Sequence, residues 1–496
     1  MSERHAPLAM DAARFRALGH RLVDEIAERL SRIPAGAVNP NETPEALRAA
    51  LGLGAPLPER GADAGALLDE AARGLFEHSL FNGHPRFFGY ITSSPAPIGM
   101  LADLLASALN ANVGAWMLAP AATEIESETV RWIAELIGYP SDCGGLLVSG
   151  GNLANLVCFF AARAALAPWD VRKHGVGAGP ALRVYTSAET HTWVQKAADL
   201  SGIGTDAIRW IETDDDLRMD LKALERRVAA DRAAGETPFL VIGTAGSVST
   251  GAVDPLPALA EFCRAEKLWF HVDGAYGGFA ARVEGAPAEL AALREADSVA
   301  VDPHKWLYTP LEAGCALVRD PMKLRGAFAY DPPYYHFEGR TINYVEYGPQ
   351  NSRGFRALKV WLAMRQVGAA GHRQMIAQDL ELSRRLAAAV DRHPELERFT
   401  QGLSITTFRY VPRELRGRIG EPETEHLLDA LNRELLDRMQ RSGEVFVSNA
   451  VVRGRYLLRA CIVNFHTRPS DVEAVAEIAA RLGAEIHRGL TKSTAR

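Results

Sequence analysis

The sequence is poor in the features that mark several whole classes of protein. Its five cysteines lie far apart with no CxxC pair, which argues against a disulfide framework and a structural zinc site. The formal net charge is −6, so nothing points to nucleic acid or an anionic membrane. The longest apolar run, around 153–166, is broken by Arg163 and too short to span a bilayer, and no signal peptide follows Met1. We therefore expect a cytoplasmic protein without a metal site and without membrane or nucleic-acid partners.

What is present is the composition of an ordinary globular protein, with 47% hydrophobic and 23% charged residues. At 496 residues the chain is too long for one simple core, so we expect two or three domains. In its middle part, short apolar segments alternate with stretches of helical length. This pattern predicts an α/β fold whose mostly parallel sheet is covered by helices on both faces. The expected strands are 146–148, 182–185, 239–243, 268–272, 298–301 and 315–318, and the expected helices are 97–109, 121–138, 153–166, 192–200, 219–233, 256–266 and 287–294.

The two ends of the chain are organised differently from this middle part. Residues 11–33 carry apolar side chains at intervals of three and four, which predicts one face of a helix, and Thr43 with Pro44 can begin a second helix. The apolar stripe of such an arm packs either on its own core or on a second subunit. Helical segments after residue 371 are mixed with short strand candidates at 404–410, 444–447 and 456–463. We predict an N-terminal helical arm over 1–85, a large domain over 86–370 and a small α+β domain over 371–496.

The stretch Ser298-Val-Ala-Val-Asp-Pro-His-Lys-Trp306 places a lysine just after a buried strand. Lysine is rarely buried, and burial lowers the pKa of its amine and makes the neutral amine a nucleophile. One use of such an amine is a Schiff base with an aldehyde such as pyridoxal phosphate (PLP). Lys305 is therefore a candidate for this role, although a lysine in a solvated loop gives the same local pattern.

Two further stretches could supply the other groups that PLP needs. Leu268-Trp-Phe-His-Val-Asp273 reads as a buried strand ending in an acid that could pair with the pyridine nitrogen. In Val148-Ser-Gly-Gly-Asn-Leu-Ala-Asn155 a strand runs into two glycines and then a helix, where backbone N–H groups could bind a phosphate. Asp273 could equally be a turn residue, His191 could stack on a ring or cap a helix, and the Gly-Gly turn could be purely structural. The candidates support one another because one cofactor requires all of them at strand ends.

The motifs Asp302-Pro-His-Lys-Trp306 and His271-Val-Asp-Gly-Ala-Tyr276, with His191 upstream, resemble those of the group II PLP-dependent amino-acid decarboxylases. The similarity covers the chain from the arm to about residue 370 and is looser beyond. It is nearest to the aromatic-L-amino-acid decarboxylases. The resemblance implies the PLP-dependent transferase fold type I, with a large domain, a small α+β domain and an N-terminal arm swapped between the subunits of a homodimer.

The resemblance also implies roles for single residues. Lys305 would form the Schiff base, Asp273 would pair with the protonated pyridine nitrogen, and His191 would stack on the ring. The remaining cofactor contacts would be made by Gly151, Asn152 and His304 at the phosphate and by Ala275 on the other ring face. Many relatives have Asn where this chain has Asp302, and a second anion beside a phosphate is unfavourable, so no phosphate role is carried over to Asp302.

The segment Tyr330-Asp-Pro-Pro-Tyr-Tyr-His-Phe-Glu-Gly339 resembles the mobile loop of the family, which is consistent with its irregular composition. The resemblance implies that Tyr334 is the general acid that protonates the substrate carbon after carbon dioxide leaves. Relatives that form aldehydes tend to have Phe there. Tyr335 is the alternative if the alignment shifts by one residue, and a loop aromatic that merely packs on the surface is the other reading.

The substrate is expected to be an aromatic L-amino acid. In plant relatives a Ser matching Ser352 goes with phenolic substrates, and Tyr90 and Trp116 are further pocket candidates by position. His84-Pro-Arg-Phe-Phe88 is equally similar to glutamate decarboxylases. Because the loop position carries Tyr334 rather than Phe, we expect decarboxylation to the amine and carbon dioxide. The alternatives are a decarboxylase of glutamate or another acidic amino acid, an aldehyde-forming relative, and a catalytically silent protein that kept the fold.

Overall fold

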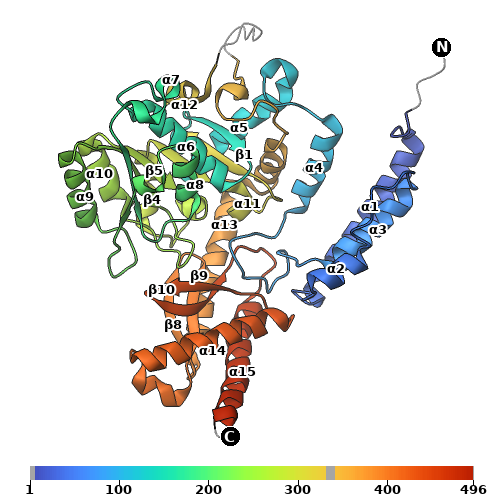
Figure 1. Ribbon diagram of the computed structural model, residues 1–496. Helices are drawn as coiled ribbons and strands as arrows, with labels where there is room; N and C mark the ends of the chain where they lie inside the picture. The colour runs from blue at the N-terminus through green and yellow to red at the C-terminus, as the bar shows by residue number, and fades with distance from the viewer. Residues whose placement is uncertain (1–5, 331–340, 495–496) are drawn as a thin grey trace.

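The computed structural model describes residues 6–330 and 341–494 of the chain. A large α/β domain lies beside a smaller C-terminal domain, and the N-terminal arm of helices stands apart from both along one side (Figure 1). The apolar segments of the large domain form a seven-stranded sheet in the order β1-β7-β6-β5-β4-β2-β3. Its strands are β1 (Gly144–Val148), β2 (Leu182–Ser187), β3 (Ile208–Ile211), β4 (Thr237–Thr244), β5 (Trp269–Asp273), β6 (Ser298–Val301) and β7 (Gly314–Val318).

The sheet is parallel except for β7, which runs antiparallel to both of its neighbours, β1 and β6. Every residue of β1, β5, β6 and β7 is buried, so both faces of the sheet are covered. This confirms the predicted fold class. The strand β3 was not predicted, because it lies at the edge of the sheet and only its first and last residues, Ile208 and Ile211, are buried.

The predicted helices of the large domain are present with small shifts at their ends. The segment expected as a helix at 287–294 is a 3-10 helix over Ala288–Glu295. The helices are α4 (Pro97–Leu109), α5 (Pro120–Ile137), α6 (Gly151–Leu166), α7 (Val171–His174), α8 (Trp193–Leu200), α9 (Leu221–Ala233), α10 (Leu256–Glu266), α11 (Pro303–Trp306) and α12 (Pro321–Phe328).

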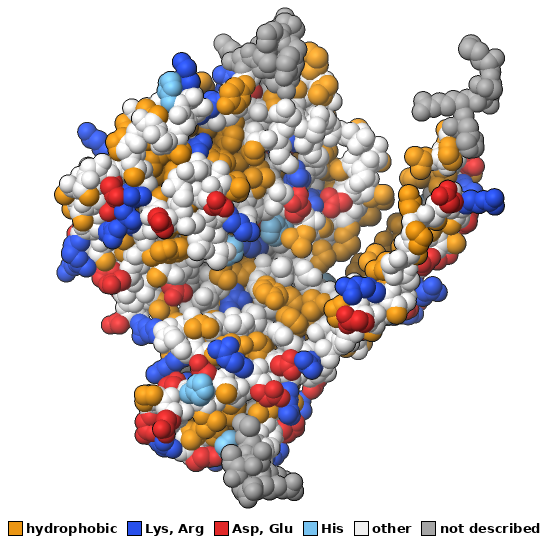
Figure 2. Space-filling view, viewed as in Figure 1, with side chains coloured by type: hydrophobic (Ala, Val, Ile, Leu, Met, Phe, Trp, Pro, Cys, Tyr) orange, Lys and Arg blue, Asp and Glu red, His pale blue; other side chains and the backbone are white. Residues whose placement is uncertain are grey.

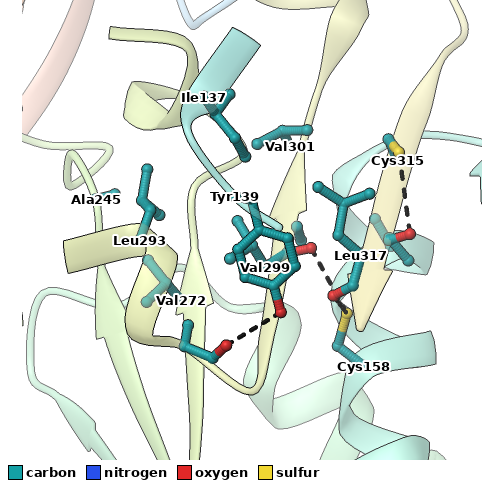
Figure 3. Packing of buried hydrophobic residues seen from close by; sticks show 14 of the residues in the cluster. Ile137, Tyr139, Cys158, Ala245, Val272, Leu293, Val299, Val301, Cys315 and Leu317 are labelled. Carbon is teal, nitrogen blue, oxygen red and sulfur yellow. Dashed lines mark hydrogen bonds between the residues drawn. The ribbon is translucent and has the colours of Figure 1, made fainter. Parts of the chain in front are cut away.

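The core between sheet and helices is closely packed and includes polar groups that are satisfied internally. The hydroxyl of Tyr139 donates to the backbone oxygen of Ala296 at 3.0 Å, and the thiol of Cys158 lies 3.9 Å from the backbone oxygen of Val299 (Figure 3). Burial raises the pKa of Cys158 to about 12. This thiol is therefore protonated at neutral pH and serves as packing rather than as a nucleophile.

The N-terminal arm consists of α1 (Ala12–Arg32), α2 (Pro44–Ala50) and α3 (Ala64–His78). The side chain of Thr43 caps α2 by accepting the N–H of Ala46, and Pro44 stands in the first turn, as the sequence predicts. Apolar side chains of the arm remain exposed, among them Phe15 at 63% and Leu75 at 62%. Figure 2 shows this apolar stripe along the arm.

The C-terminal domain has a four-stranded antiparallel sheet in the order β10-β11-β9-β8. Its elements are β8 (Leu396–Gly402), β9 (Ile405–Tyr410), α14 (Pro422–Arg441), β10 (Ser448–Val452), β11 (Arg455–Cys461) and α15 (Pro469–Thr494). The strand expected at 444–447 was misplaced: that segment enters the domain through an isolated bridge between Phe446 and Phe87, and β10 begins after it.

The long helix α13 (Ala357–Arg392) runs from the large domain into the small one. Gly368 interrupts it with φ 69° and ψ 166°, backbone angles that are accessible mainly to glycine. The division at residue 370 remains a prediction, and Gly368 is the local feature of α13 closest to it. Across residues 6–330 and 341–494, no helix combines the length and apolarity needed to cross a bilayer.

Candidate active site at the carboxyl edge of the sheet

Four chain segments that carry site candidates leave the sheet at the same edge. The parallel strands β1, β2, β5 and β6 all end there: Asp273 is the last residue of β5, and Gly151, His191 and Lys305 follow β1, β2 and β6. In open parallel sheets, ligands bind beyond the carboxyl ends of the strands. The sheet order explains how residues more than 150 positions apart in sequence reach one region of the molecule.

Lys305 lies in α11, a single helical turn directly after β6, and is held by an acid of the same turn. Its Nζ is 3.0 Å from Oδ2 of Asp302, whose side chain is 3% exposed. The Lys305 side chain is only 17% exposed. Pro303 starts the turn, where a missing N–H costs nothing. Lys305 is thus a largely buried lysine beside a buried carboxylate, rather than the solvated loop residue of the alternative interpretation.

A second acid, Asp379, holds the residues that follow Lys305 from a distant part of the chain. Oδ2 of Asp379, in α13, accepts hydrogen bonds from the indole N–H of Trp306 at 3.0 Å and the hydroxyl of Tyr308 at 2.7 Å. All three side chains are buried. Burial raises the pKa of Asp379 to about 7, opposed by these two hydrogen bonds. Sequence reasoning missed Asp379, because no local pattern signals a contact over more than 70 residues.

Asp273 ends β5 and is held by two donors. The indole Nε1 of Trp193 donates to Oδ2 at 2.7 Å, and the backbone N–H of Ala275 donates to Oδ1 at 3.1 Å. Asp273 is 7% exposed and Ala275 is 8% exposed. Trp193 was also missed, although it follows His191 by two residues and could have been found as an aromatic donor in the same motif. A carboxylate with both oxygens engaged has a fixed orientation.

His191 lies just before α8, where its Nδ1 accepts the backbone N–H of Trp193 at 3.2 Å. The residue is exposed, yet the protein around its ring lowers its pKa by partial shielding from water; Asp273 opposes this effect and Lys305 adds to it. These interactions place His191 among the charges of the site. With Nδ1 accepting a hydrogen bond, the neutral ring carries its proton on Nε2.

The Gly-Gly turn lies between β1 and α6. Gly150 has φ +92° and ψ 177°, a conformation essentially restricted to glycine, and a Cβ atom on it would lie 3.2 Å from the ring of His304. Leu153 and Ala154 donate their N–H groups to the carbonyl of Gly150. The N–H groups of Gly151 and Asn152, in the first turn of α6, have no such partner within the helix and can bind an anion. The Gly-Gly turn therefore lies beside His304, as is required if both are to contact one phosphate group.

The three substrate-pocket candidates fall into two places. Ser93 donates to the backbone oxygen of His304 at 2.8 Å, which brings the segment after Tyr90 to the lysine turn. Tyr90 itself is 64% exposed. The segments of Trp116 and Ser352 lie side by side, since Val113 donates to the carbonyl of Arg353 at 2.9 Å.

Arg353 and Glu126 form a buried ion pair behind these segments, with side chains 1% and 0% exposed. Arg353 also donates to the backbone oxygens of Val113 and Leu147, and Glu126 accepts the N–H of Leu147 at 2.9 Å. The pair therefore ties the loop of Ser352 to the strand that leads into the Gly-Gly turn. Sequence reasoning missed both residues.

Tyr334 and Tyr335 lie outside the described residues, so the loop assignment stays a prediction. The described residues fit PLP: a buried lysine follows β6, an oriented carboxylate ends β5, and a glycine turn opens a helix of 16 residues. Lys305, Asp273 and His191 could hold its aldehyde, ring nitrogen and ring face, and Gly151, Asn152 and His304 its phosphate.

Comparison with known proteins gives the same class. The model of the pyridoxal-dependent decarboxylase conserved domain matches residues 44–411. An aromatic-L-amino-acid decarboxylase of Bacillus atrophaeus is 33% identical over 471 residues, which are 94% of each chain. Tyrosine decarboxylase 4 of Petroselinum crispum is 29% identical over 95% of this chain and 93% of its own. The crystal structure of Oryza sativa TDC with PLP and tryptamine has a TM-score of 0.89 and 29% identity, covering 97% of this chain and 100% of that one.

The fold is that of the fold type I enzymes that use PLP. The chain belongs to the pyridoxal-dependent decarboxylase family, and it is a PLP-dependent amino-acid decarboxylase.

Proposed function

We propose that this enzyme removes the carboxyl group of an aromatic L-amino acid, phenolic rather than indolic, and releases the amine and carbon dioxide. The observation that carries the proposal is the convergence of Lys305, Asp273, His191 and the start of α6 at one edge of the sheet. The similarity to aromatic-type decarboxylases supports the substrate class.

In this proposal each residue has a separate task. PLP supplies an electron sink for the pair left when the carboxyl group departs. Lys305 would hold the cofactor through its side-chain amine. Asp273, oriented by Trp193 and Ala275, keeps the pyridine nitrogen protonated, which preserves the electron sink. His191 and Ala275 would contact the two faces of the ring, and Gly151, Asn152 and His304 would bind the phosphate.

Ser352 carries the preference for a phenolic side chain, with Tyr90 and Trp116 as further pocket residues. The Arg353–Glu126 pair supports this placement because it anchors the residue next to Ser352 in the protein interior. A site that offers a hydroxyl to a substrate hydroxyl discriminates strongly against substrates that lack one. Tyr334 is the acid that protonates the substrate carbon, with Tyr335 as the alternative.

The functional unit is a homodimer. Exposed apolar side chains run along the arm and continue on α4, where Leu101, Leu104 and Leu105 are 54%, 56% and 58% exposed. A monomer that exposed the apolar side chains of both the arm and α4 to water would be prone to association. A second copy of the chain would cover the apolar side chains of the arm and of α4, and by two-fold symmetry the first copy would cover the same side chains of the second.

A panel of amino acids with PLP present tests this function. Tyrosine and DOPA should give amine and carbon dioxide faster than tryptophan or phenylalanine, and glutamate should give neither. Aldehyde with hydrogen peroxide in place of amine would identify an aldehyde-forming enzyme. Turnover of glutamate alone would overturn the aromatic assignment, and no turnover of any amino acid would indicate a silent protein.

A further inference from the structure

The side chain of Tyr276 has no task in the cofactor assignment, yet it joins two segments that carry cofactor residues. Tyr276 follows Ala275 directly in the chain, and Trp306 follows Lys305. The rings of Tyr276 and Trp306 pack on each other, with 4.6 Å between their centroids and 30° between their planes. Both side chains are buried. Because the protein interior is closely packed, a shift of the Tyr276 ring would displace the turn that holds Lys305.

The hydroxyl of Tyr276 is held by the small domain. The backbone N–H of Ser404 donates to the Tyr276 oxygen at 2.8 Å, and the same oxygen lies 2.7 Å from Oγ of Ser404. Because the phenol oxygen accepts the N–H, its own hydrogen is directed to Oγ. Ser404 is buried and lies 128 positions along the chain from Tyr276. Tyr276 therefore links the small domain to the lysine turn.

The turn that carries Ser404 is seated closely on the large domain. Leu403 and Ser404 form this turn, between the end of β8 at Gly402 and the start of β9. A Cβ atom on Gly277 would lie 2.8 Å from Cδ1 of Leu403, and one on Gly251 would lie 2.2 Å from the carbonyl oxygen of Gly402. The two glycines of the large domain therefore allow the turn to approach at backbone distance. Such packing transmits a displacement of the turn instead of absorbing it.

We propose that Tyr276 is a positioning residue for the decarboxylation, through which the small domain sets the placement of Lys305 and Ala275. The inference rests on the proposed function, since it takes Lys305 as the residue that holds PLP and Ala275 as a contact of its ring. The hydroxyl of Tyr276 fixes the depth of its ring in the domain junction, and the ring supports Trp306. Asp379 holds the same indole from α13 through its N–H. Trp306 is thus fixed from two sides, and the neighbouring Lys305 with it.

This placement bears on the rate of the reaction more than on the binding of the substrate. PLP accepts the electron pair only when the bond being broken is aligned with the π system of its ring. A small tilt of the ring spoils this alignment, although the substrate can still enter the site. Loss of the Tyr276 hydroxyl should therefore lower kcat and leave KM nearly unchanged.

The test uses the full-length, PLP-loaded enzyme. Tyr276→Phe keeps a ring against Trp306 and removes the hydroxyl. With the amino acid that the enzyme turns over fastest, kcat should fall by about 10-fold, since a misplacement of about 1 Å can cost about 100-fold in rate. The visible circular dichroism of bound PLP should also change in intensity, because this signal reports how the ring is fixed in its asymmetric surroundings.

Tyr139→Phe is the matched control. Tyr139 is also a buried tyrosine, and its hydroxyl donates to the carbonyl of Ala296, which lies at the opposite end of β6 from Lys305. Both variants should unfold at lower urea concentrations than the wild type, because each loses hydrogen bonds of a buried hydroxyl. Only Tyr276→Phe should change kcat and the circular dichroism. If these two readouts stay unchanged in Tyr276→Phe, the inference is overturned while the proposed function stands.

Ser404→Ala tests the contact from the side of the small domain. It should lower kcat by about threefold, because it removes one of the two hydrogen bonds to the Tyr276 hydroxyl. The double variant should be no slower than Tyr276→Phe alone, since both changes act on the same contact. Losses of rate that multiply would show that the two residues act separately and would overturn the inference.

If Tyr276→Phe does not fold, Ser404→Ala decides the matter by itself. A lower kcat with altered circular dichroism supports the inference, and wild-type values of both overturn it. PLP that is held by a lysine other than Lys305 would overturn the proposed function and this inference together.

Discussion

The indole N–H of Trp193 donates a hydrogen bond to Oδ2 of Asp273, with 2.7 Å between nitrogen and oxygen. Both side chains are buried. Trp193 begins α8 and Asp273 ends β5, so the bond joins two segments that leave the sheet at the same edge. It fixes the carboxylate that we assign to the pyridine nitrogen, and it makes Trp193 a positioning residue.

Trp193→Phe should weaken PLP binding by about 10-fold. A hydrogen bond to a charged group contributes roughly 1.5–3 kcal/mol, and phenylalanine removes the donor while keeping an aromatic ring. Titration of the cofactor-free protein with PLP measures the effect. Trp169→Phe is the control, since the Trp169 indole donates to the carbonyl of Gly175 in an exposed loop. Equal PLP affinity in the two variants would remove the positioning role.

Glu126→Gln should lower the free energy of unfolding by about 3–5 kcal/mol, because it leaves the buried guanidinium of Arg353 without a counter-charge. Glu128→Gln on the same helix provides the comparison: its pair with Arg131 is 38–42% exposed and is worth about 1 kcal/mol or less. Urea unfolding of both variants measures the difference. Similar losses would show that the buried pair is not the anchor we describe.

Asp379→Asn tests the acid behind the lysine turn through pH. Burial raises the pKa of Asp379 to about 7, above the ordinary 3.8, so the folded protein holds this proton more tightly than the unfolded chain. Stability from this group is therefore full below about pH 4 and is lost as pH rises to 7, by up to about 1.4 kcal/mol per pH unit.

The variant lacks this titration, so its melting temperature should gain on the wild type between pH 5 and pH 7 and run parallel to it above that range. Melting curves across this range provide the measurement. Asp320→Asn is a control that should follow the wild type throughout, because the side chain of Asp320 caps α12 and asparagine caps a helix equally well. A constant offset between Asp379→Asn and the wild type at every pH would contradict the raised pKa.

Tyr334→Phe should cut amine formation and raise the share of aldehyde among the products, because the reacting carbon loses its proton donor. Tyr335→Phe is the matched variant at the adjacent position. Amine, aldehyde and hydrogen peroxide are measured together on the preferred substrate. If Tyr335→Phe shows the loss and Tyr334→Phe does not, the acid is Tyr335.

The sequence indicated the parts of the site that lie at strand ends and missed those that act through distant contacts. Lys305, Asp273 and the Gly-Gly turn could be found because a buried strand followed by a reactive residue is a local pattern. Asp379 and Arg353 could not, because their role arises only when α13 and the loop of Ser352 pack on the large domain. The strand β10 was misplaced because Val445-Phe-Val447 is a continuous apolar run, whereas buried and exposed residues alternate in Ser448–Val452, and only pairing with β11 sets the register.

The central claim is that Lys305 is the residue that carries PLP. Borohydride reduction of the PLP-loaded protein, followed by digestion and mass spectrometry, fixes the cofactor to its lysine and locates it. The account predicts a pyridoxyl group on the peptide that contains Lys305 and none in Lys305→Ala, which should also lose turnover. A pyridoxyl group on another lysine, or turnover that survives in Lys305→Ala, would contradict it.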